Sequence, residues 1–291
     1  MISSASNPTI KRVRALGAPN PQHRRAERAF VIEGIRAVEE ALNGGARPGL
    51  VLYDAEALRQ TPRGTQLLGR IARLPEAQET SRGALAAATE TVQPQGVLAV
   101  FLFVEWPPAA PAAAPLYLIL DGIRDPGNLG TILRGAEAAG VTTCWLTPDC
   151  VDLYNPKVVR AGAGVHFRLP CYLDQDWPAI RSEMERLGVA QLAALDARGD
   201  LPYYRVDWRQ PAALIVGNEA HGLSPAARQA ATARVAIPMR GGTESLNAAM
   251  AATVVIFEAL RQRSLADEAA PSSGGPQLHR TDLDAGGPRL V

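Results

Sequence analysis

Short apolar runs alternate with amphipathic stretches along the chain, and they form two groups. The first group begins with a short predicted helix, in which apolar residues at positions 10, 13 and 16 share one face and Gly17 ends the element. Strand-like runs at 30–34, 50–53 and 97–104 then alternate with helical stretches at 35–42, 64–73 and 82–88. This order predicts a small α/β unit whose sheet is closed by the last run.

The second group of apolar runs predicts a parallel sheet. Runs at 116–120, 143–146, 191–195, 212–216 and 234–237 alternate with helical segments. Strands of this kind are typical of a parallel sheet that helices cover on both faces. In such a sheet, ligands bind in the loops that follow the carboxyl ends of the strands. The sequence therefore predicts an α/β protein of two units, with its chemistry in the loops of the second.

Composition separates the two units, as expected for 291 residues, about twice a typical domain length. Residues 106–115 are a Pro and Ala tract with no means of packing a core, which predicts a semi-rigid linker. From Leu265 the chain is rich in Ala, Pro, Ser, Gly and Asp, which predicts a disordered tail. We therefore expect a basic N-terminal arm or helix at 1–28 and a first domain at 29–105. The linker at 106–115 would lead to a second domain at 116–265 and a tail at 266–291.

Charge is unevenly distributed, although the formal net charge is only +1. Against the single acid Glu27, the first 28 residues hold Lys11, Arg12, Arg14, Arg24, Arg25 and Arg28. Such a cluster fits a phosphate-binding arm, and it equally fits the solvated basic end of a helix.

Several classes of protein are disfavoured. No apolar run approaches the roughly 20 residues that a membrane span requires, and the N-terminus lacks the order of a secretory signal, so we expect a soluble cytoplasmic protein. Three cysteines without C-x-x-C spacing and four scattered histidines predict buried free thiols and no metal site. The absence of G-x-G-x-x-G, and of G-K-[ST] after a glycine loop, weighs against conventional Rossmann and P-loop nucleotide binding.

Three loops of the second unit carry clustered polar residues directly after a predicted strand. The first leads from the run 116–120 into a helix that presents Asn128 and Arg134. The second begins at Gly217, and the third ends near Ser245, which can cap the helix that follows. Taken singly, each loop could be an ordinary strand-to-helix connection.

Taken together, the three loops resemble in order and spacing the motifs of the SpoU-TrmH branch of the SPOUT methyltransferases. The matching residues are Arg134, then Gly217-Asn218-Glu219, then Ile237-Pro238-Met239 through Ser245-Leu246-Asn247. This resemblance covers roughly residues 116–263. The run 30–34 and its following helix resemble the ribosomal-L30e-like substrate-binding domain often joined to such enzymes, and the stretch 4–11 resembles the members that methylate ribosomal RNA.

The resemblance implies a deep trefoil knot and a pocket for S-adenosylmethionine in the second domain. The cofactor would be held by Gly217, Ile237, Met239 and Leu246. Arg134 would bind the phosphate and the 2′-oxygen of a target ribose and stabilise the alkoxide that develops during methyl transfer, because a guanidinium stays protonated in water. Hydrogen bonds that orient Arg134, the ribose or the loops would come from Asn128, Glu219, Ser245 and Asn247.

The resemblance also implies a structured RNA substrate, with ribosomal RNA preferred over transfer RNA because of the first domain. The side chains that bind RNA would be Lys11, Arg12, Arg14, Arg24, Arg25 and Arg160, although Arg160 suits a surface ion pair as well. Many relatives have serine where Gly162 stands, so a serine contact with RNA would be missing here. A transfer-RNA 2′-O-methyltransferase remains an alternative, as does an RNA-binding or ribosome-assembly factor without activity on the same fold.

A homodimer is the last implication of the resemblance. The helix after Ser245 would supply its apolar surface through Ala248, Ala249, Val254 and Phe257. The same stripe could instead belong to the core of one chain.

Overall fold

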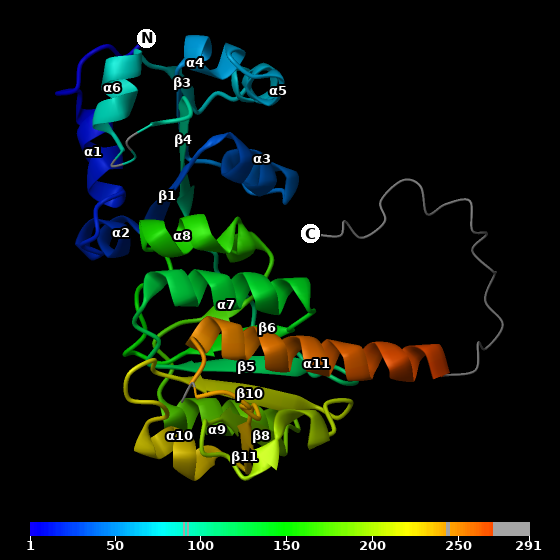
Figure 1. The fold of residues 1–291 in the computed structure, drawn as a ribbon. Helices are drawn as coiled ribbons and strands as arrows, with labels where there is room; N and C mark the ends of the chain where they lie inside the picture. Colours follow the sequence, from blue (N-terminus) through cyan, green and yellow to red (C-terminus); the bar gives the residue numbers. More distant parts are fainter. Residues whose placement is uncertain (90, 92, 243–244, 270–291) are drawn as a thin grey trace.

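The structure, a computed structural model, describes residues 1–89, 91, 93–242 and 245–269. These residues build two sheets with helices around each, one above the other in Figure 1. The helix α8 (Pro156–Gly162) lies between the two sheets. None of the helices in these ranges has the length and apolar character to cross a membrane.

The first unit contains a four-stranded sheet in the order β1-β4-β2-β3. β4 (Val97–Leu102) runs antiparallel to its neighbours β1 (Ala29–Glu33) and β2 (Leu50–Tyr53), and the short β3 (Ala77–Glu79) pairs parallel with β2. β4, the last strand of this unit in sequence order, therefore lies inside the sheet, between β1 and β2.

Among the residues that the structure describes, six helices surround the first sheet: α1 (Pro8–Leu16), α2 (Gln22–Glu27), α3 (Ile35–Asn43), α4 (Ala55–Arg59), α5 (Pro62–Ile71) and α6 (Arg82–Ala87). α1 begins after Asn7, whose side chain caps its first turn. The apolar face of α1 is buried against the sheet through Ile10, Val13 and Leu16. The basic N-terminal segment is thus a docked helix, and not an arm that extends away from the protein.

The second sheet has seven parallel strands in the order β7-β6-β5-β10-β8-β11-β9. The five predicted runs form β5 (Leu116–Asp121), β6 (Thr143–Leu146), β8 (Gln191–Leu195), β10 (Ala212–Gly217) and β11 (Ala233–Ala236). The remaining strands, β7 (Cys171–Tyr172) and β9 (Leu201–Pro202), are too short for a periodic pattern to reveal. The parallel α/β sheet predicted from the sequence is confirmed.

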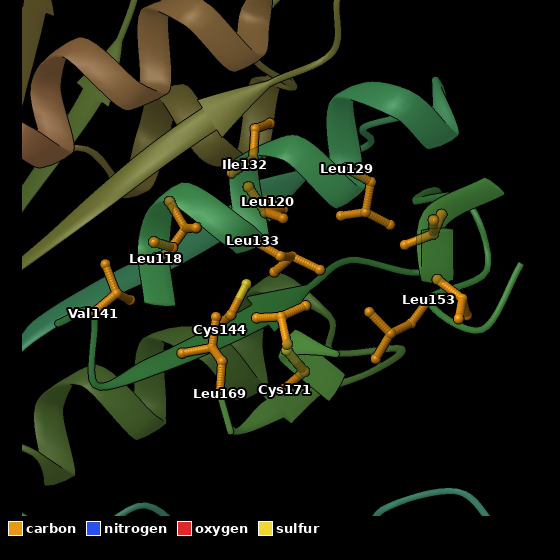
Figure 2. Packing of buried hydrophobic residues seen from close by; sticks show 14 of the residues in the cluster. Leu118, Leu120, Leu129, Ile132, Leu133, Val141, Cys144, Leu153, Leu169 and Cys171 are labelled. Atoms are coloured by element: carbon orange, nitrogen blue, oxygen red, sulfur yellow. The ribbon is translucent and has the colours of Figure 1, made fainter. Parts of the chain in front are cut away.

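Helices cover both faces of this sheet. α7 (Pro126–Ala138) and α11 (Ala248–Ala269) pack on one face, and α9 (Trp177–Arg186) and α10 (Pro225–Ala230) pack on the other (Figure 1). Alternate side chains of β5 serve the two sides, because Leu118 and Leu120 join the cluster of α7 whereas Tyr117 and Ile119 join that of α9. Figure 2 shows Leu118 and Leu120 in the first cluster with Ile132 of α7.

The chain after β11 returns across the carboxyl edge of the sheet. β11 lies beyond β8, whereas α11 packs against α7 and β10 near the middle of the sheet. Ile237, Met239, Ser245 and Leu246, from the chain between β11 and α11, lie beside Leu195 of β8 and Val216 of β10. The described part of this returning chain therefore lies at the carboxyl edge, beside the loop after β10.

The linker and the tail differ from their predictions. Ala109 of the Pro and Ala tract is buried in the cluster of α9, and the carbonyl oxygens of Pro107, Ala109, Ala114 and Pro115 accept hydrogen bonds from Tyr172, Arg186 and Arg263. The tract is therefore fastened along the second unit instead of acting as a spacer. α11 continues to Ala269, four residues into the segment predicted to be disordered, and 270–291 lie outside the described residues.

The two units share an aromatic cluster at their junction. Phe30 of β1 lies 4.6 Å from Tyr154 between ring centroids, and Phe103 stacks on Tyr154 at 3.9 Å with an angle of 9° between the ring planes. The Tyr154 hydroxyl also accepts a hydrogen bond of 3.1 Å from the Val104 N–H. Apolar packing therefore continues from one unit into the other, although the linker composition predicts separate domains.

Candidate functional site

A cleft opens at the carboxyl edge of the second sheet, and we call it the carboxyl-edge cleft. It is formed by the ends of β8 and β10, the return segment after β11 and the start of α11. Its lining includes all the residues predicted to hold a cofactor, which are Gly217, Ile237, Met239 and Leu246. Glu219 and Ser245 line it as well. Residues from the loops after β8, β10 and β11 therefore meet at one place, as the positions of the parallel strands predict, whereas Asn128 and Arg134 of the first predicted loop are not in the lining.

Gly217 is required by a tight turn. The main chain closes a small hairpin, in which the Asn218 N–H donates to the Gly222 oxygen at 2.9 Å and the Gly222 N–H donates to the Asn218 oxygen at 2.8 Å. A Cβ atom on Gly217 would stand 2.6 Å from the Gly222 carbonyl carbon and 2.7 Å from the Leu223 nitrogen. The absence of a side chain at Gly217 thus lets the chain approach itself closely, and this approach shapes the wall of the cleft.

Glu219 connects this hairpin to the turn before α7. Its carboxylate accepts hydrogen bonds from the N–H groups of Arg124 and Asp125 at 3.3 and 3.2 Å, and from the Asn128 amide at 3.0 Å. Partial burial would raise the pKa of Glu219, but these hydrogen bonds and its own N–H outweigh burial and lower the pKa below its usual value of 4.5. Glu219 is thus an ionised acceptor that fixes the turn.

Asn247 connects the third loop to the same turn. Its amide donates to the Asn128 side-chain oxygen at 2.8 Å, and its own oxygen accepts from the Ala249 and Met250 N–H groups. Asn247 is therefore the residue that caps α11. The sequence predicted Ser245 as the cap, but the helix begins three residues later and Ser245 lies in the lining of the cleft instead.

Arg134 lies on the exposed side of α7, about 9 Å along the helix axis from Asn128. The helix begins at a cap formed by Asp125, whose carboxylate accepts from the Asn128 N–H at 2.7 Å. Arg134 does not line the carboxyl-edge cleft, and it forms no hydrogen bond or ion pair with any residue in the described ranges. Its guanidinium is therefore not engaged by those residues, and its helix is held by the network of Glu219, Asn128 and Asn247.

Three acidic or amide residues at this edge were not among the predicted site residues. Asp121, buried at the end of β5, accepts from the Ser224 N–H at 2.7 Å and from the Trp177 indole at 3.1 Å. The Asn218 amide donates to the Gly122 oxygen at 2.6 Å. Asp196 follows β8 and lines the cleft, where its carboxylate can accept hydrogen bonds from a ligand. A polar residue at the end of a buried strand was the available signal for Asp121 and Asp196.

Most of the predicted RNA-binding side chains are exposed. Lys11, Arg12, Arg14 and Arg25 are on the surface of α1 and α2, and Arg12 pairs with Glu27 at 2.7 Å. Arg160 is exposed on α8. Within the described part of the chain Arg160 forms no ion pair, so the surface ion pair that we considered as its alternative role is not present there.

Arg24 is a correction, because its side chain is fully buried. Nε and Nη2 donate to Oδ2 of Asp152 at 2.9 and 2.7 Å, and the remaining N–H groups donate to the carbonyl oxygens of Leu16, Ala18 and Pro19. A guanidinium has five N–H groups, and all are used here. Arg24 therefore joins α2 to the second unit and has no donor left for RNA.

Gly162 also differs from the expectation. A Cβ atom there would face the interior, 2.9 Å from Val165 Cγ1 and 3.7 Å from His166 Nδ1. A serine hydroxyl at this position would thus point to His166 and not to RNA. Burial lowers the pKa of His166 to about 4, and its Nε2 donates to the Leu153 oxygen at 2.9 Å, so its Nδ1 is an acceptor, which has no partner in the described structure.

No group of three or more metal-ligating side chains occurs among the described residues. The lining of the cleft fits a cofactor that contains a nucleoside: Ile237 and Leu246 supply apolar walls, and Asp196 and the main chain near Gly217 supply polar groups. The fold and the site thus define a class, a parallel α/β domain whose ligand cleft is closed by a returning C-terminal segment.

Comparison with known proteins identifies the family within this class. The model of the SpoU rRNA methylase family matches residues 115–257, and that of an MRM3-like substrate-binding domain matches residues 7–99. The chain is 35% identical to an uncharacterised tRNA/rRNA methyltransferase of Synechocystis, over 90% of this chain and 94% of that protein. It is 33% identical to a 23S rRNA guanosine 2′-O-methyltransferase of Bacillus subtilis, RlmP, over 88% of this chain and 97% of that protein.

Solved structures give the same result. A crystal structure of the SpoU methyltransferase AviRb from Streptomyces viridochromogenes, in complex with S-adenosylmethionine, matches with a TM-score of 0.79 and 30% identity, over 89% of this chain and 98% of that one. A crystal structure of an RNA 2′-O-ribose methyltransferase matches with a TM-score of 0.77 and 33% identity, over 90% and 99% of the two chains. This protein belongs to the SpoU rRNA methylase family, and its second unit has the SPOUT fold.

Proposed function

We propose that this protein transfers the methyl group of S-adenosylmethionine to a ribose 2′-hydroxyl in ribosomal RNA. The observation that carries the proposal is the pair of hydrogen bonds from Asn128 to Glu219, which lines the carboxyl-edge cleft, and from Asn247 to Asn128, which join the cleft to the helix that bears Arg134. Relatives named as ribosomal RNA 2′-O-methyltransferases support the same reaction.

The cofactor is held by the lining of the carboxyl-edge cleft. Ile237 and Leu246 contribute apolar contact area, and the hairpin at Gly217 supplies the polar wall. S-adenosylmethionine, when bound, supplies an electrophilic methyl group. Attack of the 2′-oxygen on that methyl carbon would break the carbon–sulfur bond and release a neutral thioether, and the hydroxyl proton would pass to solvent. The 2′-oxygen must therefore approach from the side opposite the sulfur, and the loops must hold it there.

Arg134 acts on the ribose. Its guanidinium keeps its charge in water, so it stabilises negative charge on the 2′-oxygen and binds the neighbouring phosphate, and it does not serve as a simple base. Asn128, Glu219 and Asn247 act as positioning residues, because their hydrogen bonds fix the first turn of the helix that carries Arg134. We place the exposed basic residues of α1 and α2 on the RNA outside the site.

The protein acts as a homodimer in this proposal. On α11 the side chains of Met250, Val254 and Phe257 follow at helical spacing and are 60, 37 and 43% exposed. Ala249, which we had also expected at the dimer surface, is buried in its own chain. Phe257→Glu should therefore give a monomer in light scattering, and a dimer that survives this change would contradict the placement of the interface on α11.

Methyl transfer from labelled S-adenosylmethionine to ribosomal and transfer RNA transcripts tests the proposal. Arg134→Ala should lower transfer to ribosomal RNA by roughly 100- to 1000-fold, the size of effect seen when one donor to a developing oxyanion is removed. Cofactor binding, measured by calorimetry, should stay close to that of the wild type.

Arg181→Ala, which removes an exposed arginine of α9 on the other face of the sheet, is the matched control. Transfer to transfer RNA alone would replace the substrate that we propose. No cofactor binding at millimolar concentration would favour the alternative of an RNA-binding factor without activity.

A further inference from the structure

A second cavity lies at the junction of the two units, and we call it the junction cavity. It has a volume of about 590 Å³. Its walls come from α2, from the chain that leaves β4, and from the loops after β6 and β7. The first unit, which matches a substrate-binding domain, and the methylase unit therefore both contribute to one cavity that is open to solvent.

The junction cavity and the carboxyl-edge cleft flank the same turn. Both are built on loops at the carboxyl edge of the second sheet, on either side of β5. A Cβ atom on Gly122, in the turn after β5, would stand 3.7 Å from the Cβ of Asp149 and 3.9 Å from that of Asn218. The loop after β6 and the hairpin of the cleft thus both approach Gly122. An RNA strand that reaches the cleft from the first unit has the junction cavity close by.

Aromatic side chains form part of the wall. Phe103 stacks on Tyr154, and Trp106 and Tyr172 complete the aromatic group. Trp106 is partly exposed, and within the described ranges its indole has neither a stacking partner nor a hydrogen-bond acceptor. An indole in this state offers a flat face and one donor to a ligand, which is the chemistry that binds an unstacked base.

Cations stand at the α2 side of the junction cavity. Arg25 is exposed, and the Arg28 guanidinium lies 5.8 Å from the centroid of the Phe103 ring. Arg28 also pairs with Glu105 at 2.9 Å, but the two side chains are 62 and 78% exposed, so this ion pair contributes little and can open. Phosphate oxygens that approach this wall therefore meet two available guanidinium groups.

The opposite wall carries acceptors. Asp174 and Gln175 follow β7 and line the junction cavity. A carboxylate accepts hydrogen bonds from the amino and imino groups on the edge of a base. An ionised phosphate has no such donors, so this wall favours the base over the phosphate. Arg28 and Asp174 also adopt left-handed backbone conformations, with φ of 47° and 54°. Residues other than glycine rarely adopt this conformation. Such conformations are often retained where they position a functional side chain.

We propose that the junction cavity binds one unstacked nucleotide of the RNA substrate, next to the nucleotide that is methylated. The base stacks on Trp106 with its edge toward Asp174, and the phosphate lies between Arg25 and Arg28. This inference rests on the proposed function, because it assumes an RNA substrate at the carboxyl-edge cleft. It adds a site that reads the sequence around the target and holds the strand in register.

Cross-linking locates the nucleotide in the unaltered protein. A ribosomal RNA transcript that contains 4-thiouridine is irradiated with the full-length protein, and the cross-linked peptides are identified by mass spectrometry. The proposal predicts cross-links within 103–106 or 172–175. Cross-links confined to α1 and to the loops of the carboxyl-edge cleft would overturn the proposal.

Kinetics test the role of stacking. Trp106→Ala should raise the KM for the RNA transcript roughly 10- to 100-fold, and Trp106→Phe, which keeps a stacking face, should restore most of the loss. The affinity for S-adenosylmethionine and the melting temperature should not change. Arg28→Ala should raise KM as well, whereas Arg181→Ala should have no effect. Unchanged KM in both Trp106→Ala and Arg28→Ala would contradict the proposal.

Two further experiments distinguish a nucleotide within an RNA strand from a free nucleotide, and failure of the cavity proposal from failure of the proposed methyl transfer. Uridine and adenosine monophosphates at millimolar concentration should not lower the yield of cross-links, because a nucleotide within a strand binds more tightly when its neighbours are also bound. Relief by a free monophosphate would make the cavity a site for a free nucleotide and would overturn the proposal. A wild-type protein that cross-links at 103–106 but transfers no methyl group would contradict the proposed function, not the cavity.

Discussion

Arg24 offers a direct test of how the two units are joined. Its charge suggests RNA binding, but its five donors are all used inside the protein, on Asp152 and on three carbonyl oxygens. Arg24→Met keeps much of the side-chain volume and removes every donor. Asp152, which is 13% exposed, would then hold a carboxylate with no cation beside it.

The expected cost of Arg24→Met is large. Breaking a buried ion pair by removing one partner lowers the free energy of unfolding by about 3–5 kcal/mol. In a protein of this size each kcal/mol lowers the melting temperature by about 2–4 °C, so the variant should melt about 6–20 °C below the wild type. Arg24→Met combined with Asp152→Asn should recover part of this loss, because no unpaired charge then remains.

Arg25→Met is the matched control, since Arg25 is the next residue and is exposed. Its melting temperature should stay near that of the wild type, because surface substitutions usually change stability by less than about 0.5 kcal/mol. Thermal unfolding of the three variants at one protein concentration gives the comparison. A normal melting temperature for Arg24→Met, together with weakened RNA binding, would refute the structural role of Arg24.

Three other substitutions test single contacts. Gly217→Ala places a Cβ 2.6 Å from the Gly222 carbonyl carbon, so S-adenosylmethionine should bind at least 10-fold more weakly in calorimetry, and unchanged affinity would contradict the tight turn. Gly162→Ser should melt above Gly162→Ala by about 2–4 °C, because only the hydroxyl can donate to His166 Nδ1, and equal melting temperatures would show that this acceptor is already satisfied. Glu219→Gln should slow methyl transfer at every pH between 6 and 8. The pKa of Glu219 is lowered, so its carboxylate is ionised above pH 4.5, and the hydrogen bonds that it accepts are lost only as the pH falls below that value. An ionisation between pH 6 and 8 in the rate of methyl transfer that disappears in Glu219→Gln would contradict this lowered pKa.

Periodicity predicted the main elements of the fold because their burial is regular. The run 116–120 is buried at every position, and Ile10, Val13 and Leu16 are all buried on one face of α1. The strands β3, β7 and β9 have only two or three residues, which is too few to show a period. The sequence pattern also gives no information on strand order, so the position of β4 inside the first sheet could not be inferred from it.

The separation into two domains was only partly predictable. The Pro and Ala tract has the composition of a spacer, but its carbonyl oxygens accept hydrogen bonds from Tyr172, Arg186 and Arg263, which lie far away in the sequence. The aromatic contact between Phe30 and Tyr154 likewise joins residues from different units. Contacts of this kind depend on tertiary structure, and composition does not report them.

The site was predicted from motif resemblance, and its details depend on the structure. Glu219, Asn128 and Asn247 were predicted as members of one site, but their mutual hydrogen bonds follow from the packing of α11 on α7. The choice of Asn247 over Ser245 as the cap of α11 depends on where the helix begins, which sequence patterns locate only within a few residues. The role of Arg24 depends on burial, which charge alone does not reveal.

The central claim is methyl transfer to a ribose 2′-hydroxyl, and the most direct measurement identifies the product. Ribosomal RNA transcribed without modifications is incubated with the protein and with S-adenosylmethionine that carries a trideuterated methyl group. The RNA is then digested to nucleosides and analysed by mass spectrometry. We predict a trideuterated 2′-O-methyl nucleoside with the wild type and roughly 100- to 1000-fold less of it with Arg134→Ala. Label on a base, or no label although the cofactor binds, would contradict the account.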